Sequence, residues 1–234
     1  MTDADLSIFK QWEHYRKVID GNYMLHNEII ESLREIISNR FGDEEFTFLD
    51  LGCGDAHVAA SVLKDFNVKK YLGIDLSQDA LGRAKKALAS VATNVELIDG
   101  EYLRKLAELD DQFDIIFNGY SLHHFQLEDK ARYFKATARL QEKGIQVMAD
   151  VVREEGQSRD QFVEDIVTIE GGQNYKTFNE EDLRLLSAHV RSSDFPETFS
   201  TLKQHASEAG YSSAEKVFST EFYTLMLFSH DNCN

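Results

Sequence analysis

The chain has 234 residues, of which 42% are apolar and 28% are charged, a balance that is typical of a folded domain with a sizeable core and excludes a disordered chain. Asp and Glu number 41 against 25 Lys and Arg, so the formal net charge is -16. Nucleic acids and anionic membranes bind clusters of cationic side chains, and this chain has no such run, so a small molecule is the better expected partner.

Apolar residues recur at helical spacing between residues 5 and 40, which predicts two helices separated at Gly21–Asn22. Five short runs rich in β-branched and aromatic residues then alternate with helical runs. The predicted strands are 46–51, 71–75, 95–98, 113–117 and 144–149. Strands that alternate with helices favour the α/β class, in which helices cover both faces of a parallel sheet.

After residue 150 the alternation lapses. Asn179 and Asp182 predict the N-cap and N3 positions of a helix, and Pro196 suits the first turn of another helix that ends at Gly210. Two predicted strands, 211–219 and 222–229, are joined so tightly that they form an antiparallel hairpin. We therefore expect one domain over 1–234, divided into an N-terminal helical cap (1–42), a core (46–150), a helical insertion over the acceptor pocket (151–195) and a closing helix and hairpin (196–234).

The segment Phe48-Leu-Asp-Leu-Gly-Cys-Gly-Asp-Ala-His57 predicts a strand that ends in glycines and opens a helix. Glycines at such a turn let a ligand approach the backbone, and in doubly wound sheets this turn lies at the ligand-binding edge. Dinucleotide-binding proteins usually carry a third glycine, in the pattern GxGxxG, where this chain has His57. That difference argues against a pyrophosphate ligand.

Acidic residues end the next two predicted strands. Asp75 follows the glycine turn by about 20 residues, the spacing expected of a carboxylate that binds both ribose hydroxyls. Asp99 ends the third strand, where its carboxylate can accept a hydrogen bond from an amino group such as that of adenine. With the glycine turn, these acids describe a nucleoside site without a phosphate cradle.

In this order, the motifs resemble those of the class I S-adenosylmethionine-dependent methyltransferases. The resemblance rests on residues 50–56 as the glycine-rich first motif, on the two strand-end acids and on the fourth-strand motif 113–118. It implies a Rossmann-like, seven-stranded, mostly parallel sheet with an antiparallel C-terminal hairpin, and S-adenosylmethionine as the cofactor. Ala56 departs from the family, which often has a third glycine there, but a small residue should suffice. The cofactor contacts that the resemblance implies are Asp50, Gly52, Cys53, Gly54, Asp75, Leu76, Asp99, Gly100, Glu101 and Asn118, with Tyr15 from an N-terminal helix that closes over the site.

Two adjacent histidines follow the fourth predicted strand, in Ser121-Leu-His-His-Phe125, and Asp150 ends the fifth. Because neighbouring parallel strands end at the same edge of the sheet, we expect His123, His124 and Asp150 to meet. An imidazole is suited to remove a proton from a methyl acceptor near neutral pH, and a carboxylate can orient it. One of two adjacent histidines usually points away from a given site, and the sequence favours His124 only slightly as the general base.

Tyr23 and His26, on the predicted N-terminal helices, are candidate contacts to the acceptor. His57, His189 and His205 are interpreted as ordinary helix residues. No metal is expected, because the acid cluster of catechol-type methyltransferases is not visible.

The expected reaction is transfer of a methyl group from S-adenosylmethionine to an oxygen or nitrogen of a small organic molecule. The alternatives are C-methylation of a quinone-like acceptor, a non-catalytic scaffold that binds S-adenosylmethionine, and a nicotinamide-dependent dehydrogenase, which His57 and the paired histidines disfavour. We expect a monomer or homodimer. Two cysteines cannot form a disulfide framework, and the first ten residues lack a secretory signal, so the expected location is cytoplasmic.

Overall fold

The structure is a computed structural model that describes residues 12–92, 94–169 and 175–230, with side chains described from Arg16 onward. Its strands are β1 (Phe46–Leu51), β2 (Val68–Asp75), β3 (Val95–Asp99), β4 (Ile115–Gly119), β5 (Ile145–Arg153), β6 (Glu197–Thr198), β7 (Ser213–Ser219) and β8 (Tyr223–Ser229). Its helices are α2 (Trp12–Asp20), α3 (His26–Phe41), α4 (His57–Leu63), α5 (Gln78–Ala87), α6 (Tyr102–Leu106), α7 (Leu127–Arg139), α8 (Arg159–Ile169), α9 (Glu180–Ser193) and α10 (Phe199–Ala209). The turn η1 (Leu122–His124) is a 3-10 helix.

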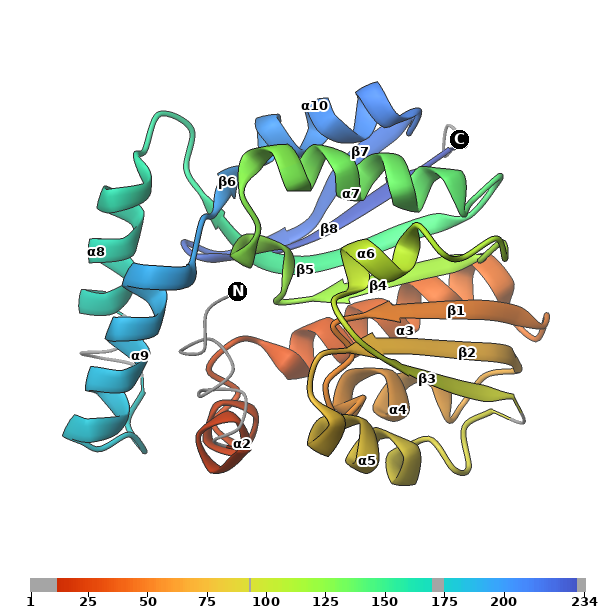
Figure 1. The fold of residues 1–234 in the computed structure, drawn as a ribbon, viewed down its shortest axis with the longest axis horizontal. Coiled ribbons are helices and arrows are strands. Elements are labelled where there is room, and N and C mark those ends of the chain that lie inside the picture. The colour runs from red at the N-terminus through yellow and green to blue at the C-terminus, as the bar shows by residue number, and fades with distance from the viewer. Residues whose placement is uncertain (1–11, 93, 170–174, 231–234) are drawn as a thin grey trace.

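The predicted sheet is confirmed. Its strand order is β3-β2-β1-β4-β5-β8-β7 (Figure 1). The first five strands pair in parallel, whereas β8 pairs antiparallel with both β5 and β7. The described residues add an eighth strand to the seven expected, because the two-residue β6 pairs with the end of β5.

The strand order reverses between β1 and β4. The chain runs outward from β1 to β2 and β3, and then returns to β4 on the other side of β1. At such a switch point the loops after the two neighbouring strands diverge and leave a crevice, which is where doubly wound sheets bind ligands. The glycine turn follows β1 and the paired histidines follow β4, so both predicted motifs lie at this crevice.

Helices bury both faces of the sheet, as a central parallel sheet requires. One face packs against α3, α4 and α5 through side chains such as Leu33, Val62 and Ala84. The other face packs against α6, α7 and α10 through side chains such as Leu106 and Phe134. Because the central strands are covered on both sides, β5 is buried along nearly its whole length.

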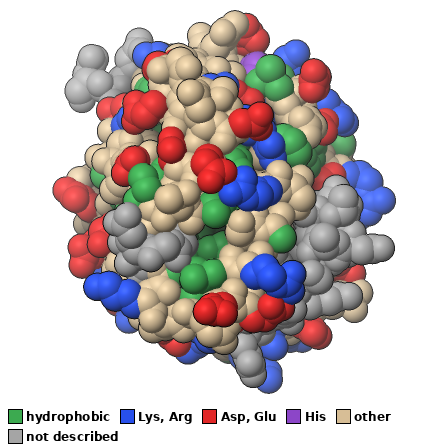
Figure 2. All heavy atoms as spheres, turned by 90° about the vertical axis from the view of Figure 1, so that its left-hand side faces the viewer, with side chains coloured by type: hydrophobic (Ala, Val, Ile, Leu, Met, Phe, Trp, Pro, Cys, Tyr) green, Lys and Arg blue, Asp and Glu red, His purple; other side chains and the backbone are tan. Residues whose placement is uncertain are grey.

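The insertion forms a third, smaller core beside the sheet. Phe162 of α8 and Val190 of α9 pack with Val151 of β5 and Tyr223 of β8, so the two helices stand beyond the sheet edge at the left of Figure 1. Figure 2 faces that side and shows hydrophobic side chains in a hollow, flanked by acidic and basic ones. No described helix is long and apolar enough to cross a membrane.

Local signals set most helix ends. The predicted pair at the start of α9 is confirmed as a capping box, in which Asn179 and Asp182 each accept the other's backbone N–H. The prediction for Pro196 is wrong, because α10 begins only at Phe199. The hydroxyl of Thr198 accepts the N–H of Thr201 and caps the helix, and Glu197 and Thr198 are extended and pair with β5 as β6.

Candidate active site

A cavity of about 600 Å³ lies where β1, β2, β3 and β4 end. Three parts of the chain line it, namely the α2–α3 segment, the turns that follow the strands, and the α8–α9 insertion. The predicted nucleoside and histidine motifs therefore border one continuous space.

The glycine turn after β1 folds back on the end of β2. The N–H groups of Gly52 and Cys53 both donate to the carbonyl of Ile74, at 2.9 and 3.1 Å. The φ angles of Gly52 and Gly54, 70° and 55°, lie in the left-handed region that favours glycine. A Cβ on Gly52 would stand 2.7 Å from Oγ of Ser121, whereas one on Gly54 would meet no heavy atom within 4 Å. The backbone at Gly54 is thus open where the turn borders the cavity.

The side chain of Asp75 ties this turn to the end of β2. Its Oδ2 accepts the N–H of Gly54 and its Oδ1 accepts the N–H of Ser77, each at 2.8 Å. Burial raises the pKa of Asp75, and these N–H groups act against that rise. Each carboxylate oxygen has a second lone pair, so Asp75 can still accept hydrogen bonds from the hydroxyls of a ligand.

Asp50 lies beneath the turn, where it is buried and borders the cavity. Burial raises the pKa of Asp50 to about 7, against the hydrogen bond that the hydroxyl of Tyr71 donates to its Oδ2 at 2.7 Å. Burial and the neighbouring charge of Asp50 also raise the pKa of Cys53. Cys53 is therefore a protonated thiol, which is a weak nucleophile.

Four further predicted cofactor residues border the cavity, namely Leu76, Asp99, Gly100 and Glu101. Asp99 is exposed and accepts a hydrogen bond from Nε2 of Gln78 at 2.6 Å. The carboxylate of Glu101 accepts the N–H groups of Leu103 and Arg104, so it caps α6. Glu101 thus has a structural role whether or not it contacts a ligand.

One predicted cofactor residue stands apart from this wall. Asn118 is fully buried, and its Nδ2 donates to the carbonyl of Leu51 at 3.2 Å and to Oγ of Ser121 at 2.8 Å. It joins the ends of β1 and β4 and does not line the cavity. The side chain of Tyr15 lies outside the described residues.

Both predicted histidines lie on η1, immediately after β4, and border the cavity. The backbone N–H of His123 donates to Oδ2 of Asp150 at 3.1 Å, and its ring Nδ1 pairs with Oδ1 of the same carboxylate. Nδ1 of His124 lies 3.2 Å from the carbonyl of Ser193. The expected meeting with Asp150 therefore takes place through His123, with Asp150 buried behind it.

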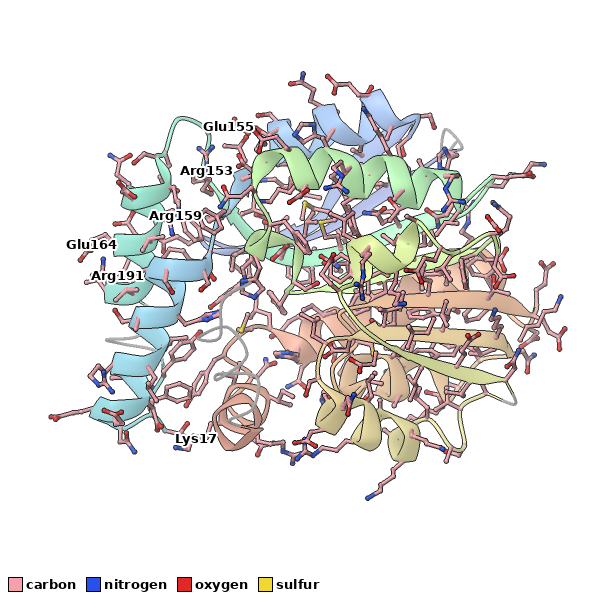
Figure 3. All side chains as sticks on the ribbon, in the orientation of Figure 1. Lys17, Arg153, Glu155, Arg159, Glu164 and Arg191 are labelled. Atoms are coloured by element: carbon pink, nitrogen blue, oxygen red, sulfur yellow. The ribbon has the colours of Figure 1, made fainter. Side chains whose placement is uncertain are left out.

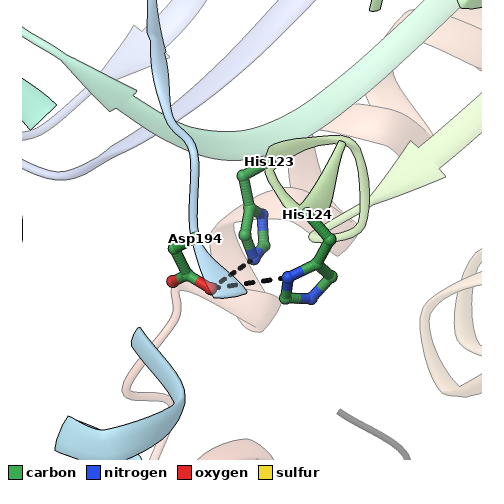
Figure 4. A group of neighbouring side chains, drawn as sticks. All are labelled: His123, His124 and Asp194. Carbon is green, nitrogen blue, oxygen red and sulfur yellow. Dashed lines mark ion pairs between the residues drawn. The ribbon is translucent and has the colours of Figure 1, made fainter. Parts of the chain in front are cut away.

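A second carboxylate, which the sequence analysis did not single out, completes this cluster. Oδ1 of Asp194 lies 3.4 Å from Nδ1 of His124 and 3.7 Å from Nε2 of His123 (Figure 4). It also lies 3.6 Å from Nε2 of His189. His189, interpreted from the sequence as an ordinary helix residue, lies on α9 and borders the cavity, as does His57. Asp194 directly follows α9, and no periodic or capping signal marks it as a site residue.

Cationic side chains fix Asp194 in place through the backbone around it. The N–H of Phe195 donates to the carbonyl of His123 at 2.7 Å. Nζ of Lys130 donates to the carbonyl of Phe195 at 2.5 Å, and Nε of Arg159 donates to the carbonyl of Asp194 at 2.7 Å. Figure 3 shows Arg159 between the insertion and the linker that leaves it. The position of Asp194 therefore depends on the core, through Lys130, and on α8, through Arg159.

The charges of the cluster favour its ionised forms. Burial lowers the pKa of His123, but the carboxylates of Asp150 and Asp194 outweigh burial and raise it above its ordinary value. Burial likewise raises the pKa of Asp194, but the neighbouring histidines outweigh burial and lower it. Cation and carboxylate thus stabilise each other in a buried setting.

The insertion side of the cavity is apolar and aromatic. Its wall includes Tyr120, Val151, Ile166, Tyr175, Phe178 and Leu186. Tyr23, a predicted acceptor contact, stands behind this wall, with its ring 4.7 Å from that of Tyr175 and its hydroxyl 2.9 Å from Oγ1 of Thr177. His26, the other predicted contact, does border the cavity, and burial lowers its pKa to about 4.

Comparison with known proteins supplies independent findings. Residues 48–144 match the family model described as a methyltransferase domain. The probable methyltransferase ltbC of Aspergillus luteorubrus is 32% identical over 87 residues, which are 35% of this chain and 30% of that protein. An uncharacterized methyltransferase of Bacillus cytotoxicus is 24% identical over 163 residues, 67% of this chain and 72% of that protein.

Solved structures extend the likeness to most of the chain. Magnesium protoporphyrin IX methyltransferase from Synechocystis, with bound S-adenosylhomocysteine (SAH), superposes with a TM-score of 0.61. The superposition covers 92% of this chain and 86% of that one, at 13% identity. Similarity at this level of identity establishes a shared fold.

Proposed function

Because residues 48–144 match the family model described as a methyltransferase domain and the chain shares its fold with solved methyltransferases, we propose that it transfers a methyl group from S-adenosylmethionine to an oxygen or nitrogen atom of a small organic molecule. When bound, S-adenosylmethionine supplies an electrophilic methyl group on a sulfonium sulfur. The chain's own residues must bind that cofactor, place the acceptor and take up the acceptor's proton.

The strand ends suit the cofactor. The carboxylate of Asp75 would accept hydrogen bonds from the ribose hydroxyls of the bound cofactor, and the carboxylate of Asp99 would accept one from its adenine amino group. The open backbone at Gly54, where a Cβ would meet nothing within 4 Å, leaves space for the methionine part. These groups are hydrogen-bond acceptors and neutral backbone. Among the described residues, no Lys or Arg side chain that would favour a pyrophosphate borders this part of the cavity.

The histidine cluster suits the removal of a proton. A hydroxyl or protonated amine must lose a proton on methylation, and imidazole is the side chain best matched to that task near neutral pH. His124 borders the cavity and its Nδ1 faces Ser193 and Asp194, so the acceptor's proton goes to Nε2. The pair of His123 with Asp150 lies beside it and orients η1.

One observation carries the proposal: a single cavity joins the glycine turn and Asp75 at one end to His123 and His124 at the other. Transfer requires the methyl group and the acceptor atom to meet in line, about 3 Å apart. The apolar and aromatic wall of the insertion supports an organic acceptor of mixed polarity, a few atoms of which reach the histidines.

The first experiment is calorimetric titration of the purified chain with S-adenosylmethionine and SAH, with NAD as the control ligand. We expect saturable binding of the first two and none of NAD. Asp75→Asn removes the negative charge at nearly constant shape and should weaken SAH binding at least tenfold, because hydrogen bonds to a charged acceptor contribute about 1.5–3 kcal/mol. A folded protein that binds neither compound would disprove the proposal.

Acceptor screening then tests the proton acceptor. His124→Gln should lower kcat by roughly 10²–10⁴ for an O- or N-acceptor and leave SAH affinity unchanged. A chain that binds SAH and retains full turnover in this variant has no base at His124. Transfer to carbon would instead favour the C-methylation alternative, and SAH binding without turnover on any acceptor would favour the scaffold.

A further inference from the structure

The spacing around Asp194 is wide for hydrogen bonds and suitable for metal coordination. Its Oδ1 is 3.4 Å from Nδ1 of His124 and 3.7 Å from Nε2 of His123 (Figure 4). Ligands on a tetrahedral ion with bonds of about 2.1 Å lie about 3.4 Å from one another. In the described part of the chain, one nitrogen from each of these two histidines and one Asp194 oxygen all lie within 4.8 Å of one another.

The histidine nitrogens lie at long distances, 3.4 to 3.7 Å, from the carboxylate oxygen at the centre of this group. Oδ1 of Asp194 is buried and accepts no hydrogen bond from the described residues. A buried carboxylate oxygen is costly unless a donor or a cation compensates it. In the absence of an ion the neighbouring histidines compensate the charge of Asp194, and a metal ion at the centre of the cluster would replace their protons in that role.

Asp150 prepares His123 for coordination. It occupies Nδ1 of the ring, which turns Nε2 of His123 toward Asp194. A carboxylate on one ring nitrogen with a metal on the other is the common arrangement around metal-binding histidines, because it fixes the tautomer and raises the basicity of the ligand atom.

The backbone holds the two histidines and Asp194 close together, and an ion can reach them from the cavity. His123 and His124 share the short turn η1, and the N–H of Phe195 ties the residue next to Asp194 to the carbonyl of His123 at 2.7 Å. Both histidines and Asp194 border the cavity. An ion can therefore enter without opening the core.

From these observations we propose that Nε2 of His123, Nδ1 of His124 and Oδ1 of Asp194 form a binding site for a divalent transition-metal ion of the Zn²⁺, Co²⁺, Ni²⁺ class. Two imidazoles and one carboxylate favour these ions over Mg²⁺ and Ca²⁺, which prefer oxygen ligands. His189, whose Nε2 is 3.6 Å from Oδ1 of Asp194, is a candidate fourth ligand. The site departs from the sequence-based expectation of no metal, which considered only an acidic cluster.

A bound ion would also regulate methyl transfer, a consequence that rests on the proposed function. A ring that coordinates metal through Nδ1 keeps its own proton on Nε2 and cannot take another from the acceptor. Loading the site with Zn²⁺ should therefore inhibit transfer that depends on His124.

The test uses the purified full chain after treatment with a chelator. Co²⁺ is titrated while its visible absorption is recorded, and Zn²⁺ is titrated by calorimetry. We expect one ion per chain. Asp150→Asn should weaken binding about 10–100-fold, the usual effect of losing the carboxylate behind a ligating histidine, and Asp194→Asn should weaken it at least as much. His205→Gln is the matched control, because His205 lies on α10 and does not border the cavity.

Failure of the metal site and failure of the cofactor site are distinguishable on the same sample. Folded protein that binds SAH and shows no saturable Co²⁺ binding would overturn the metal site alone. Co²⁺ binding that survives Asp194→Asn, or that His205→Gln weakens equally, would also overturn it. Co²⁺ binding without SAH binding would leave the metal site standing and remove the proposed function.

Discussion

Asp50 is a buried carboxyl group whose ionisation opposes folding. Its pKa in the folded chain is about 7, whereas an unfolded chain has an ordinary value near 4. Between about pH 4 and pH 7 the folded state binds a proton that the unfolded state has lost, so the free energy of unfolding falls as pH rises. Asp50→Asn removes this loss, and we expect the variant to gain up to about 4 kcal/mol over the parent chain above pH 7.

Chemical denaturation at pH 4.5, 6 and 8 measures this effect. The difference between variant and parent should be small at the lowest pH and grow toward the highest. Asp43→Asn, at an exposed position before β1, is the control and should show no such trend. A constant difference at all three pH values would mean that Asp50 does not titrate with a raised pKa.

A site residue could be predicted from the sequence where it ends a predicted strand. Asp75 and Asp99 end β2 and β3, and their positions required only the alternation of strands and helices. Asp194 could not be predicted in this way. It meets the histidines because the chain folds back through α8 and α9. The next residue, Phe195, is then held by the backbone of His123 and the side chain of Lys130, and these contacts leave no local sequence pattern.

At the scale of elements, α7 anchors the linker between α9 and β6. Lys130 is almost fully buried, and its Nζ donates to the carbonyls of Phe125 and Phe195. Lys130→Met keeps the apolar stem but leaves two partly buried carbonyls without that donor, at about 1–3 kcal/mol each. We expect the free energy of unfolding to fall by roughly 2–4 kcal/mol, and the linker that carries Asp194 to loosen.

Lys135→Met is the matched control, because Lys135 lies on the same helix and is exposed. Urea denaturation should show little change for this control and a clear loss for Lys130→Met. Equal stability of the two variants would show that Lys130 contributes no more than a surface lysine and that other contacts hold the linker.

Most helices and strands could be predicted from the sequence, because helix capping and hydrophobic periodicity depend on residues that are close together in the chain. The break at Gly21–Asn22, the capping box of α9 and the end of α10 at Gly210 all appear as predicted. α10 does not start at Pro196 as predicted, because the hydroxyl of Thr198 accepts the N–H of Thr201 and caps the helix there. β6 was missed since its two residues become a strand only by pairing with β5, a contact between distant parts of the chain.

At the scale of the whole molecule, the class I fold was predictable and the shape of the acceptor side was not. The mostly parallel sheet and the closing antiparallel hairpin are present as expected. The insertion packs as a separate small core, and tertiary bonds join it to α2, among them the one from Nζ of Lys17 to Asp182 at 2.6 Å. The apolar wall therefore forms only when three parts of the chain pack together, so no single segment of the sequence predicts it.

The negative net charge of the molecule should affect how fast a positively charged ligand associates with it. A chain of net charge -16 is surrounded by a negative potential that attracts cations. S-adenosylmethionine carries one more positive charge than SAH, because its sulfur is a sulfonium, while the two are otherwise alike in shape. We expect the association rate constant of S-adenosylmethionine to fall roughly two- to tenfold as the ionic strength rises from about 0.01 M to 0.15 M, since the Debye length shortens from about 30 to 8 Å.

Stopped-flow binding at these two ionic strengths checks the prediction, and SAH serves as its own matched control. The rate constant for SAH should change little, and dissociation rates should be nearly constant for both ligands, because screening acts mainly on approach. If both ligands lose association rate equally, the salt acts on the protein itself, for instance by closing the cavity between α2 and α9. If neither changes, the acidic surface serves solubility and the cavity receives its cofactor without electrostatic steering.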